Sequence, residues 1–227
     1  MCFTPIISLT TAIIEFIIAT FILVFFRKSL INKFFVTLIY VLGIYQFTEF
    51  MLCTSNNPLL WAKLGFIAYT FLPAIAMFYI IKYYFPKNKT SKAKFIYLIP
   101  IIFTVIALSL GEFIARAECS KFFVIIQSMM WSISPILHYS YGLYYGGSII
   151  LTSFLLLNKI KKEKNKIKKK LQINWLLAIV LSLVPALLLV SILPSLEIYF
   201  PSIYCEFAIL FSIVALIAAK LDNRLKK

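Results

Sequence analysis

A few polar side chains interrupt the long apolar stretches of this sequence, and they are the residues most able to do chemistry. Glu15 falls midway along one apolar run, and Gln46 and Glu49 are three residues apart in the next. His138, the only histidine, and Glu206 stand where two later runs begin. Carboxylate, amide and imidazole groups could together hold a cation, relay a proton or bind a small polar ligand. The alternative is a buried hydrogen-bond network that fixes helix packing.

Glu15 shares one side of its segment with small and polar residues. By the periodicity of 3.6 residues per turn, this side also carries Ser8, Thr11, Ala12 and Ala19. Small residues let neighbouring helices approach closely. We therefore expect Glu15 to point into a helix bundle and not toward lipid.

Four cysteines, Cys2, Cys53, Cys119 and Cys205, form a second set of reactive residues. An even number of cysteines on one oxidising side of a membrane fits two disulfides, for which three connectivities exist. A metal site that includes His138 is the rival interpretation, but no C-x-x-C spacing favours it. Unpaired buried thiols are a third alternative. We predict disulfides and leave their connectivity open.

No sequence motif of a known enzyme class is present. The chain lacks a P-loop, a dinucleotide-binding glycine motif, G-x-S-x-G and H-E-x-x-H. An intramembrane metal-dependent hydrolase built on Glu49, His138 and Glu206, with or without a cysteine, is an alternative, although one histidine is too few for the usual catalytic zinc set. A transporter or channel that uses Glu15 is another. We predict a protein that is not an enzyme and needs no metal or cofactor.

The composition decides which elements position these residues. Of the 227 residues, 62% are hydrophobic and only 14% are charged, against about a quarter charged in soluble domains. This excludes a soluble globular protein, which has too little interior for so much apolar surface. The apolar runs do not alternate as barrel strands do. The sequence predicts an all-α polytopic bundle, a single domain over 1–227, with seven spans at 5–26, 34–53, 60–81, 95–111, 139–157, 171–193 and 203–219.

The stretch Phe122–Leu137 is ambiguous. It is apolar but short for a span, and it contains Gln127, several serines and Pro135. An interfacial or re-entrant segment fits this length better than a transmembrane helix. We therefore count seven spans and not eight.

Basic residues predict the orientation. In the seven-span arrangement, all but three of the 23 lysines and arginines fall on one side, and the exceptions are Lys63, Arg116 and Lys121. The positive-inside rule makes that side cytoplasmic. We expect the N-terminus outside, the C-terminus in the cytoplasm and a multi-pass location in the cell membrane, typical of a bacterial inner membrane. The first run lacks a positive start, so we expect no cleaved signal peptide.

The segment Lys159–Lys170 is the most basic part of the chain. Positive-inside bias alone explains it, and contact with anionic lipid head groups is a compatible role. The lysines expected to make that contact are Lys161, Lys162, Lys168, Lys169 and Lys170. The segment has no aromatic residue, so we do not expect nucleic acid as a partner. The cytoplasmic loops are too short for an effector domain, so a signal would pass to a separate effector protein.

Two short motifs resemble a family of uncharacterised bacterial membrane proteins. Its members begin Met-Cys-Phe-Ser and carry Gln-x-x-Glu-Gly-x-x-Trp in the second span; this chain begins Met-Cys-Phe-Thr and has Gln46 and Glu49, with Phe50 and Cys53 at the last two motif positions. His138 followed by Tyr139 is similar to the family as well. The resemblance implies a shared membrane fold and no known activity. The helix layout resembles, more loosely, the seven-helix sensory region of membrane histidine kinases.

Taken together, these features predict an integral membrane protein that acts as a sensor or binds a small ligand or partner. The polar site would lie near the outer leaflet and contain Gln46, Glu49, His138 and Glu206, with Glu15 deeper in the membrane.

Overall fold

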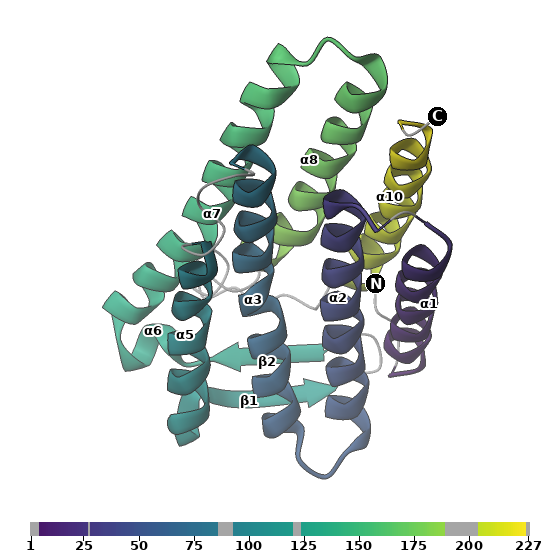
Figure 1. The fold of residues 1–227 in the computed structure, drawn as a ribbon. Helices are drawn as coiled ribbons and strands as arrows, with labels where there is room; N and C mark the ends of the chain where they lie inside the picture. Colours follow the sequence, from purple (N-terminus) through teal and green to yellow (C-terminus); the bar gives the residue numbers. More distant parts are fainter. Residues whose placement is uncertain (1–4, 27, 86–92, 120–123, 189–203, 226–227) are drawn as a thin grey trace.

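The protein was analysed as a computed structural model, and most of its residues form helices (Figure 1). The structure describes the whole chain except residues 1–4, 27, 86–92, 120–123, 189–203 and 226–227. The described elements are α1 (Pro5–Phe25), α2 (Leu30–Thr54), α3 (Pro58–Tyr84), η1 (Lys94–Tyr97), α5 (Leu98–Ser109), η2 (Gly111–Phe113), β1 (Ile114–Cys119), β2 (Val124–Ser128), α6 (Met130–Ile133), α7 (Pro135–Lys162), α8 (Lys166–Leu187) and α10 (Tyr204–Arg224).

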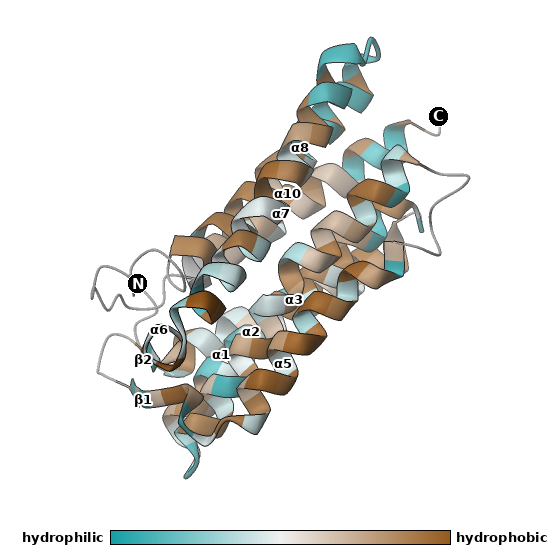
Figure 2. Ribbon diagram, turned by 90° about the vertical axis from the view of Figure 1, so that its left-hand side faces the viewer, coloured by the Kyte–Doolittle hydropathy of each residue, from teal (hydrophilic) through white to brown (hydrophobic). Residues whose placement is uncertain are grey.

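Four of the described helices are long and apolar enough to cross a membrane: α1, α2, α3 and α7. This agrees with a helical membrane protein. Each of the seven predicted runs overlaps a described helix, although α5 with η1 is short and the end of the run at 171–193 lies outside the described residues. Figure 2 shows apolar residues along most of the helical body and a hydrophilic tip where α7 meets α8.

Local capping explains where the helices begin. The side chains of Ser29, Asn57, Ser134 and Asn165 each accept a hydrogen bond from a backbone N–H in the first turn of the helix that follows. These residues are favoured caps because their short polar side chains satisfy N–H groups that have no partner inside the helix. The links that precede α2, α3 and α8 are short and polar, so the chain reverses there and each of these helices runs antiparallel to the one before it.

The helices pack around an aromatic and aliphatic core. Helices α1, α2 and α3 follow one another side by side, α7 and α8 form a long hairpin, and α10 packs against α8, α2 and α1. Phe34 lies against both Tyr79 and Trp175, so its ring joins α2, α3 and α8. Large apolar side chains also face outward, among them Leu143 and Ile150 on α7. An apolar exterior is expected of a helix bundle in lipid.

Pro73 interrupts the hydrogen-bond ladder of α3, and tyrosines of α7 repair it. Proline has no N–H, so the carbonyl of Tyr69, four residues earlier, loses its helical donor. The Tyr145 hydroxyl donates to that carbonyl at 3.2 Å, and the Tyr144 hydroxyl donates to the next carbonyl, that of Thr70, at 2.9 Å. In lipid a freed carbonyl needs such a partner. The proline therefore fixes α3 to α7.

A two-stranded hairpin departs from the all-α expectation. Strands β1 and β2 pair antiparallel, with Cys119 opposite Val124 and Ile114 opposite Ser128. The stretch Phe122–Leu137 is therefore not one helix: its described part contains β2, the one-turn α6 and the start of α7 at Pro135. The run Val124–Ile126 is β-branched, which favours a strand as much as an apolar helix. The hydrophobicity of this segment alone therefore could not decide between a strand and a helix.

Candidate functional site

The helical face around Glu15 is buried, as its periodicity predicts. Ser8, Thr11, Ala12, Glu15 and Ala19 are all buried in the structure. Helix α1 packs most extensively against α2 and also packs against α10. The Glu15 carboxyl group is therefore enclosed within the helix bundle and does not face outward.

Gly43 allows α1 and α2 to come this close. A Cβ atom at this position would lie 2.8 Å from the Phe16 ring, nearer than carbon atoms normally approach. The Phe16 ring occupies the space that any larger residue at position 43 would need.

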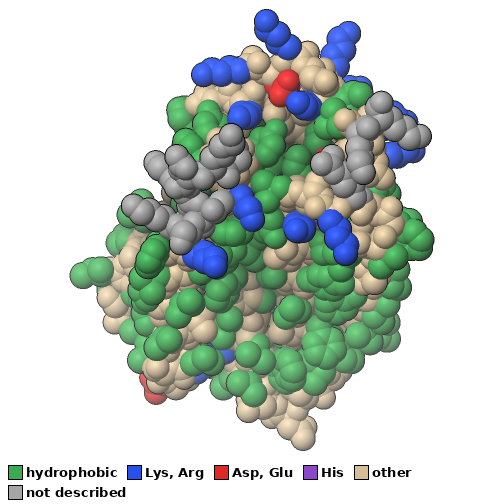
Figure 3. Space-filling model, viewed as in Figure 1, with side chains coloured by type: hydrophobic (Ala, Val, Ile, Leu, Met, Phe, Trp, Pro, Cys, Tyr) green, Lys and Arg blue, Asp and Glu red, His purple; other side chains and the backbone are tan. Residues whose placement is uncertain are grey.

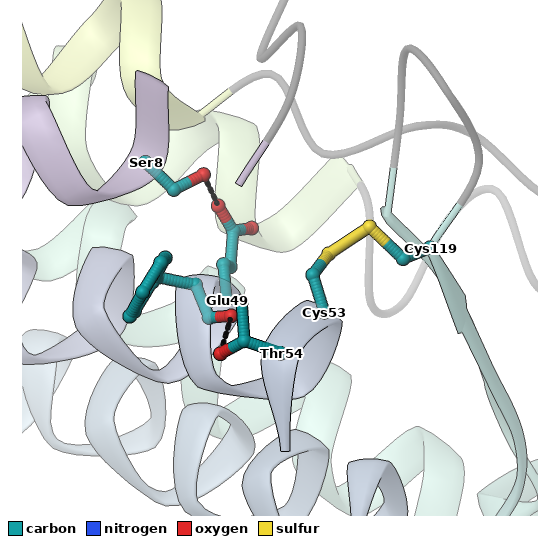
Figure 4. Close-up of a disulfide and its surroundings, with 6 residues drawn as sticks. Ser8, Glu49, Cys53, Thr54 and Cys119 are labelled. Atoms are coloured by element: carbon teal, nitrogen blue, oxygen red, sulfur yellow. Dashed lines mark hydrogen bonds between the residues drawn. A yellow bond between two sulfur atoms is a disulfide. The ribbon is translucent and has the colours of Figure 1, made fainter. Parts of the chain in front are cut away.

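Glu49 is the centre of a hydrogen-bond network between the two helices. The Tyr45 hydroxyl donates to Glu49 Oε1 at 2.7 Å, and the Ser8 hydroxyl donates to Glu49 Oε2 at 3.5 Å. Figure 4 shows Ser8 reaching across from α1 to this carboxylate. Neutral hydroxyl donors thus hold both oxygens of a buried acid. Tyr45 was missed in the sequence, although its spacing of four residues from Glu49 places both on one helical face.

Glu15 has a different environment from Glu49. Its side chain is fully buried, and neither carboxyl oxygen has a hydrogen-bond partner among the residues that the structure describes. It lies near enough to Glu49 for the two carboxyl groups to interact electrostatically. Gln46, also buried, is on the same helix as Glu49. Two neighbouring acids, one of them without a partner, would suit a cation or a hydrogen-bond donor.

A disulfide lies one turn beyond Glu49. Cys53, at the end of α2, is bonded to Cys119, at the end of β1, with a Cα–Cα distance of 5.3 Å (Figure 4). The bond fastens the hairpin to α2, and β1 also packs against α3. Of the other two cysteines, Cys2 lies outside the described residues. Cys205 and Glu206 are in the first turn of α10, and their side chains also lie outside the described part.

His138 is separated from the two acids. It is buried at the start of α7, where its ring contacts Trp131 and Tyr139. Helices α6 and α7 begin on the far left of Figure 1, whereas α1 is on the far right. Of the predicted outer set, Glu15 is on α1, Gln46 and Glu49 are on α2, and His138 is at the start of α7, so that the set comes from three described helices. No three metal-ligating side chains of His, Cys, Asp or Glu gather anywhere in the described ranges.

The opposite end of the molecule is basic. All five lysines predicted to contact lipid are exposed there, on the last turns of α7 and the first turns of α8: Lys161, Lys162, Lys168, Lys169 and Lys170. Figure 3 shows Lys and Arg side chains gathered at this end and hydrophobic side chains over the flanks below it. The Lys159 ammonium lies over the rings of Tyr83 and Tyr84, at 5.5 and 4.8 Å from their centroids. Such cation–aromatic pairs are favourable at a membrane interface.

The basic end also contains polar contacts that the sequence analysis did not single out. The Asn32 amide donates to Asp222 at 3.4 Å, and the Gln172 amide donates to the Tyr83 hydroxyl at 2.8 Å. Asn32 and Asp222 are 190 residues apart, so no local pattern connects them. These contacts join the first turn of α2 to the last turns of α10, and α8 to the end of α3.

Comparison of the chain with protein-family models, with curated proteins and with solved structures finds no match in any of the three. The family resemblance based on Gln46, Glu49 and His138 therefore stays a prediction.

Proposed function

We propose that this protein is a seven-span protein of the cell membrane, with its N-terminus outside and its C-terminus in the cytoplasm. The distribution of charge supports this orientation, because the exposed lysines of the α7–α8 tip lie at one end and the disulfide lies at the other. Basic residues favour the cytoplasmic side and disulfides persist outside the cytoplasm. The end of α2 that carries Glu49 and Cys53 is then the outer end.

We propose that the buried acids between α1 and α2 bind a small ligand and that the protein is a sensor or binding protein, not an enzyme. Glu15 is the observation that supports this proposal, since a buried carboxyl group without a hydrogen-bond partner is unfavourable for stability. Such a group is retained where something binds it. With Glu49 beside it and no basic side chain described between them, the preferred ligand is a small cation.

Thermal unfolding of the purified full-length protein in detergent tests this proposal. The probes are sodium, potassium and small alkylammonium ions, each added as the chloride salt. We expect at least one of them to raise the melting temperature of the unmodified protein, and Glu15→Gln to abolish that rise. Glu112→Gln is the matched control, because Glu112 is exposed in η2 and should leave the rise unchanged. If none of these cations stabilises the unmodified protein, the cation site is rejected.

A transporter or channel is the second candidate, and the position of Glu15 favours it. The residue lies near the middle of α1, where coupling residues of transporters are found. The purified protein in liposomes should then move the stabilising cation, and Glu15→Gln should stop the flux. Binding without flux would leave the sensor interpretation and exclude transport.

A further inference from the structure

A cavity of about 240 Å³ opens at the basic end of the bundle, far from the two buried glutamates. It is lined by residues of four helices and by the residue that follows α10: Ile31, Tyr83, Lys168, Leu171, Asp222 and Leu225. It is well above the size needed for a single water molecule and slightly below the range of drug-sized ligand sites.

The cavity presents two opposite charges that do not neutralise each other. Asp222 is buried and Lys168 is exposed, and no ion pair joins either of them to another described residue. The only described hydrogen bond of the Asp222 carboxylate is the long contact from Asn32. A buried carboxylate without a cation is unfavourable. A ligand with its own positive charge would therefore stabilise this site.

Neutral groups on the wall add hydrogen-bonding capacity. The Tyr83 hydroxyl accepts from the Gln172 amide, so its own hydrogen remains available for an acceptor such as a phosphate oxygen. Gln172 does not itself line the cavity, but its amide holds the Tyr83 hydroxyl in place. Ile31, Leu171 and Leu225 form the apolar part of the wall.

We propose that this cavity binds the head group of phosphatidylethanolamine from the cytoplasmic leaflet. The ammonium group would meet Asp222, the phosphate would meet Lys168 and Tyr83, and the glycerol region would lie against the apolar wall. Beside the cavity, the Lys159 ammonium lies over the rings of Tyr83 and Tyr84, and such aromatic and basic side chains are typical of the level of lipid head groups. Phosphatidylglycerol has no amine for Asp222, and the choline head group has no N–H to donate to it.

Native mass spectrometry of the full-length protein tests this proposal. The protein is incubated with equal amounts of phosphatidylethanolamine, phosphatidylcholine and phosphatidylglycerol that share the same acyl chains. We expect retention of phosphatidylethanolamine over phosphatidylcholine by about tenfold, as for one charge-assisted hydrogen bond. Equal retention of all three lipids, or a preference for phosphatidylglycerol, would overturn the assignment.

Variants connect the preference to this cavity. Asp222→Asn should remove the discrimination between ethanolamine and choline lipids, whereas Lys168→Gln should weaken retention of both. Lys169→Gln is the control, because Lys169 is equally exposed but does not line the cavity. Leu225→Trp should fill the cavity and lower retention without touching the Asn32 contact, which covers the case in which Asp222→Asn fails to fold.

A competition experiment separates the lipid from a soluble ligand with the same chemistry. An excess of O-phosphoethanolamine is added to the complex with phosphatidylethanolamine. Continued retention of the lipid supports a membrane ligand that also uses the apolar wall. Displacement of the lipid would instead assign the cavity to a soluble zwitterion and overturn the lipid proposal.

Discussion

Both ends of the helix bundle bury a carboxylate, but the two are surrounded differently. At the end that carries the disulfide, Glu49 accepts hydrogen bonds from the hydroxyl groups of Tyr45 and Ser8, and a second acid, Glu15, lies nearby. At the basic end, the one described hydrogen bond to the Asp222 carboxylate comes from the Asn32 amide, and Lys168 lines the same cavity. The described donors to Glu49 are thus neutral hydroxyl groups, whereas Asp222 shares its cavity with a base.

This difference shows why the same residue type serves different ligands. A pair of acids with no base nearby favours a simple cation. An acid and a base that face one cavity without pairing favour a zwitterion. The end that carries Glu49 is also crosslinked by a disulfide, whereas the described contacts at the basic end are noncovalent. The two ends of the bundle therefore differ both in covalent crosslinking and in the arrangement of their charged side chains.

The largest expected effect comes from removing the disulfide between Cys53 and Cys119. Cys53→Ser combined with Cys119→Ser should lower the free energy of unfolding by about 4 kcal/mol, the size expected for a crosslink across some 66 residues. Denaturant unfolding in detergent micelles measures the change. The unmodified protein treated with a reducing agent is the control and should lose at least as much stability. An unchanged unfolding midpoint would show that the hairpin is held by packing alone.

The next effect comes from the partnered acid. Glu49→Leu removes the acceptor for the hydroxyls of Tyr45 and Ser8, so stability should fall by about 1–3 kcal/mol. Tyr45→Phe should lose about 1 kcal/mol in the same assay, because only one hydrogen bond is removed. If Glu49→Leu is as stable as the unmodified protein, the network contributes nothing to packing.

Replacement of Glu15, the acid without a described hydrogen bond, should raise the stability of the protein. Glu15→Leu removes a buried polar group without a described hydrogen bond, so the free energy of unfolding should rise by about 1 kcal/mol in the absence of ligand. Thermal unfolding without added cations measures this change, with Glu15→Gln as the isosteric comparison. A loss of stability in Glu15→Leu would mean that the carboxyl has an unrecognised structural partner.

The smallest effect on folding is expected at the basic tip. Lys161→Gln combined with Lys162→Gln should change stability by less than about 0.5 kcal/mol in phosphatidylcholine nanodiscs, because both side chains are exposed. In nanodiscs that contain phosphatidylglycerol, the added stabilisation should fall by about 1 kcal/mol per lysine. Equal stabilisation of the variant and the unmodified protein by phosphatidylglycerol would exclude these lysines as lipid contacts.

The parts of the fold that depend on local geometry could be predicted from sequence. The burial of Glu15 together with Ser8 and Ala12 follows from helical periodicity, and the structure confirms it. The mostly helical character follows from long apolar runs that must satisfy their own backbone groups in lipid. Tyr45 could have been found by the same spacing rule, since it precedes Glu49 by four residues.

The parts that depend on long-range contact could not be predicted. Pairing Cys53 with Cys119 requires knowledge of how the segment after α5 turns back beneath α2, which no spacing in the sequence reveals. The contact of Asn32 with Asp222 has the same difficulty. The hairpin was missed for another reason. A short apolar run such as Val124–Ile126 has the same hydrophobic pattern whether it forms a strand or a helix, so the pattern cannot decide between them.

Formation of the disulfide also depends on the insertion of two helices into the membrane. In the proposed topology, the chain between Cys53 and Cys119 enters the cytoplasm through α3 and returns to the outside through α5. The bond therefore closes a covalent ring that passes through the bilayer twice, and it can form only after both helices have crossed. A protease cut in the cytoplasmic segment between α3 and α5 would leave one covalent molecule until the bond is reduced. Oxidised protein is thus a chemical marker of chains whose first half has been fully inserted.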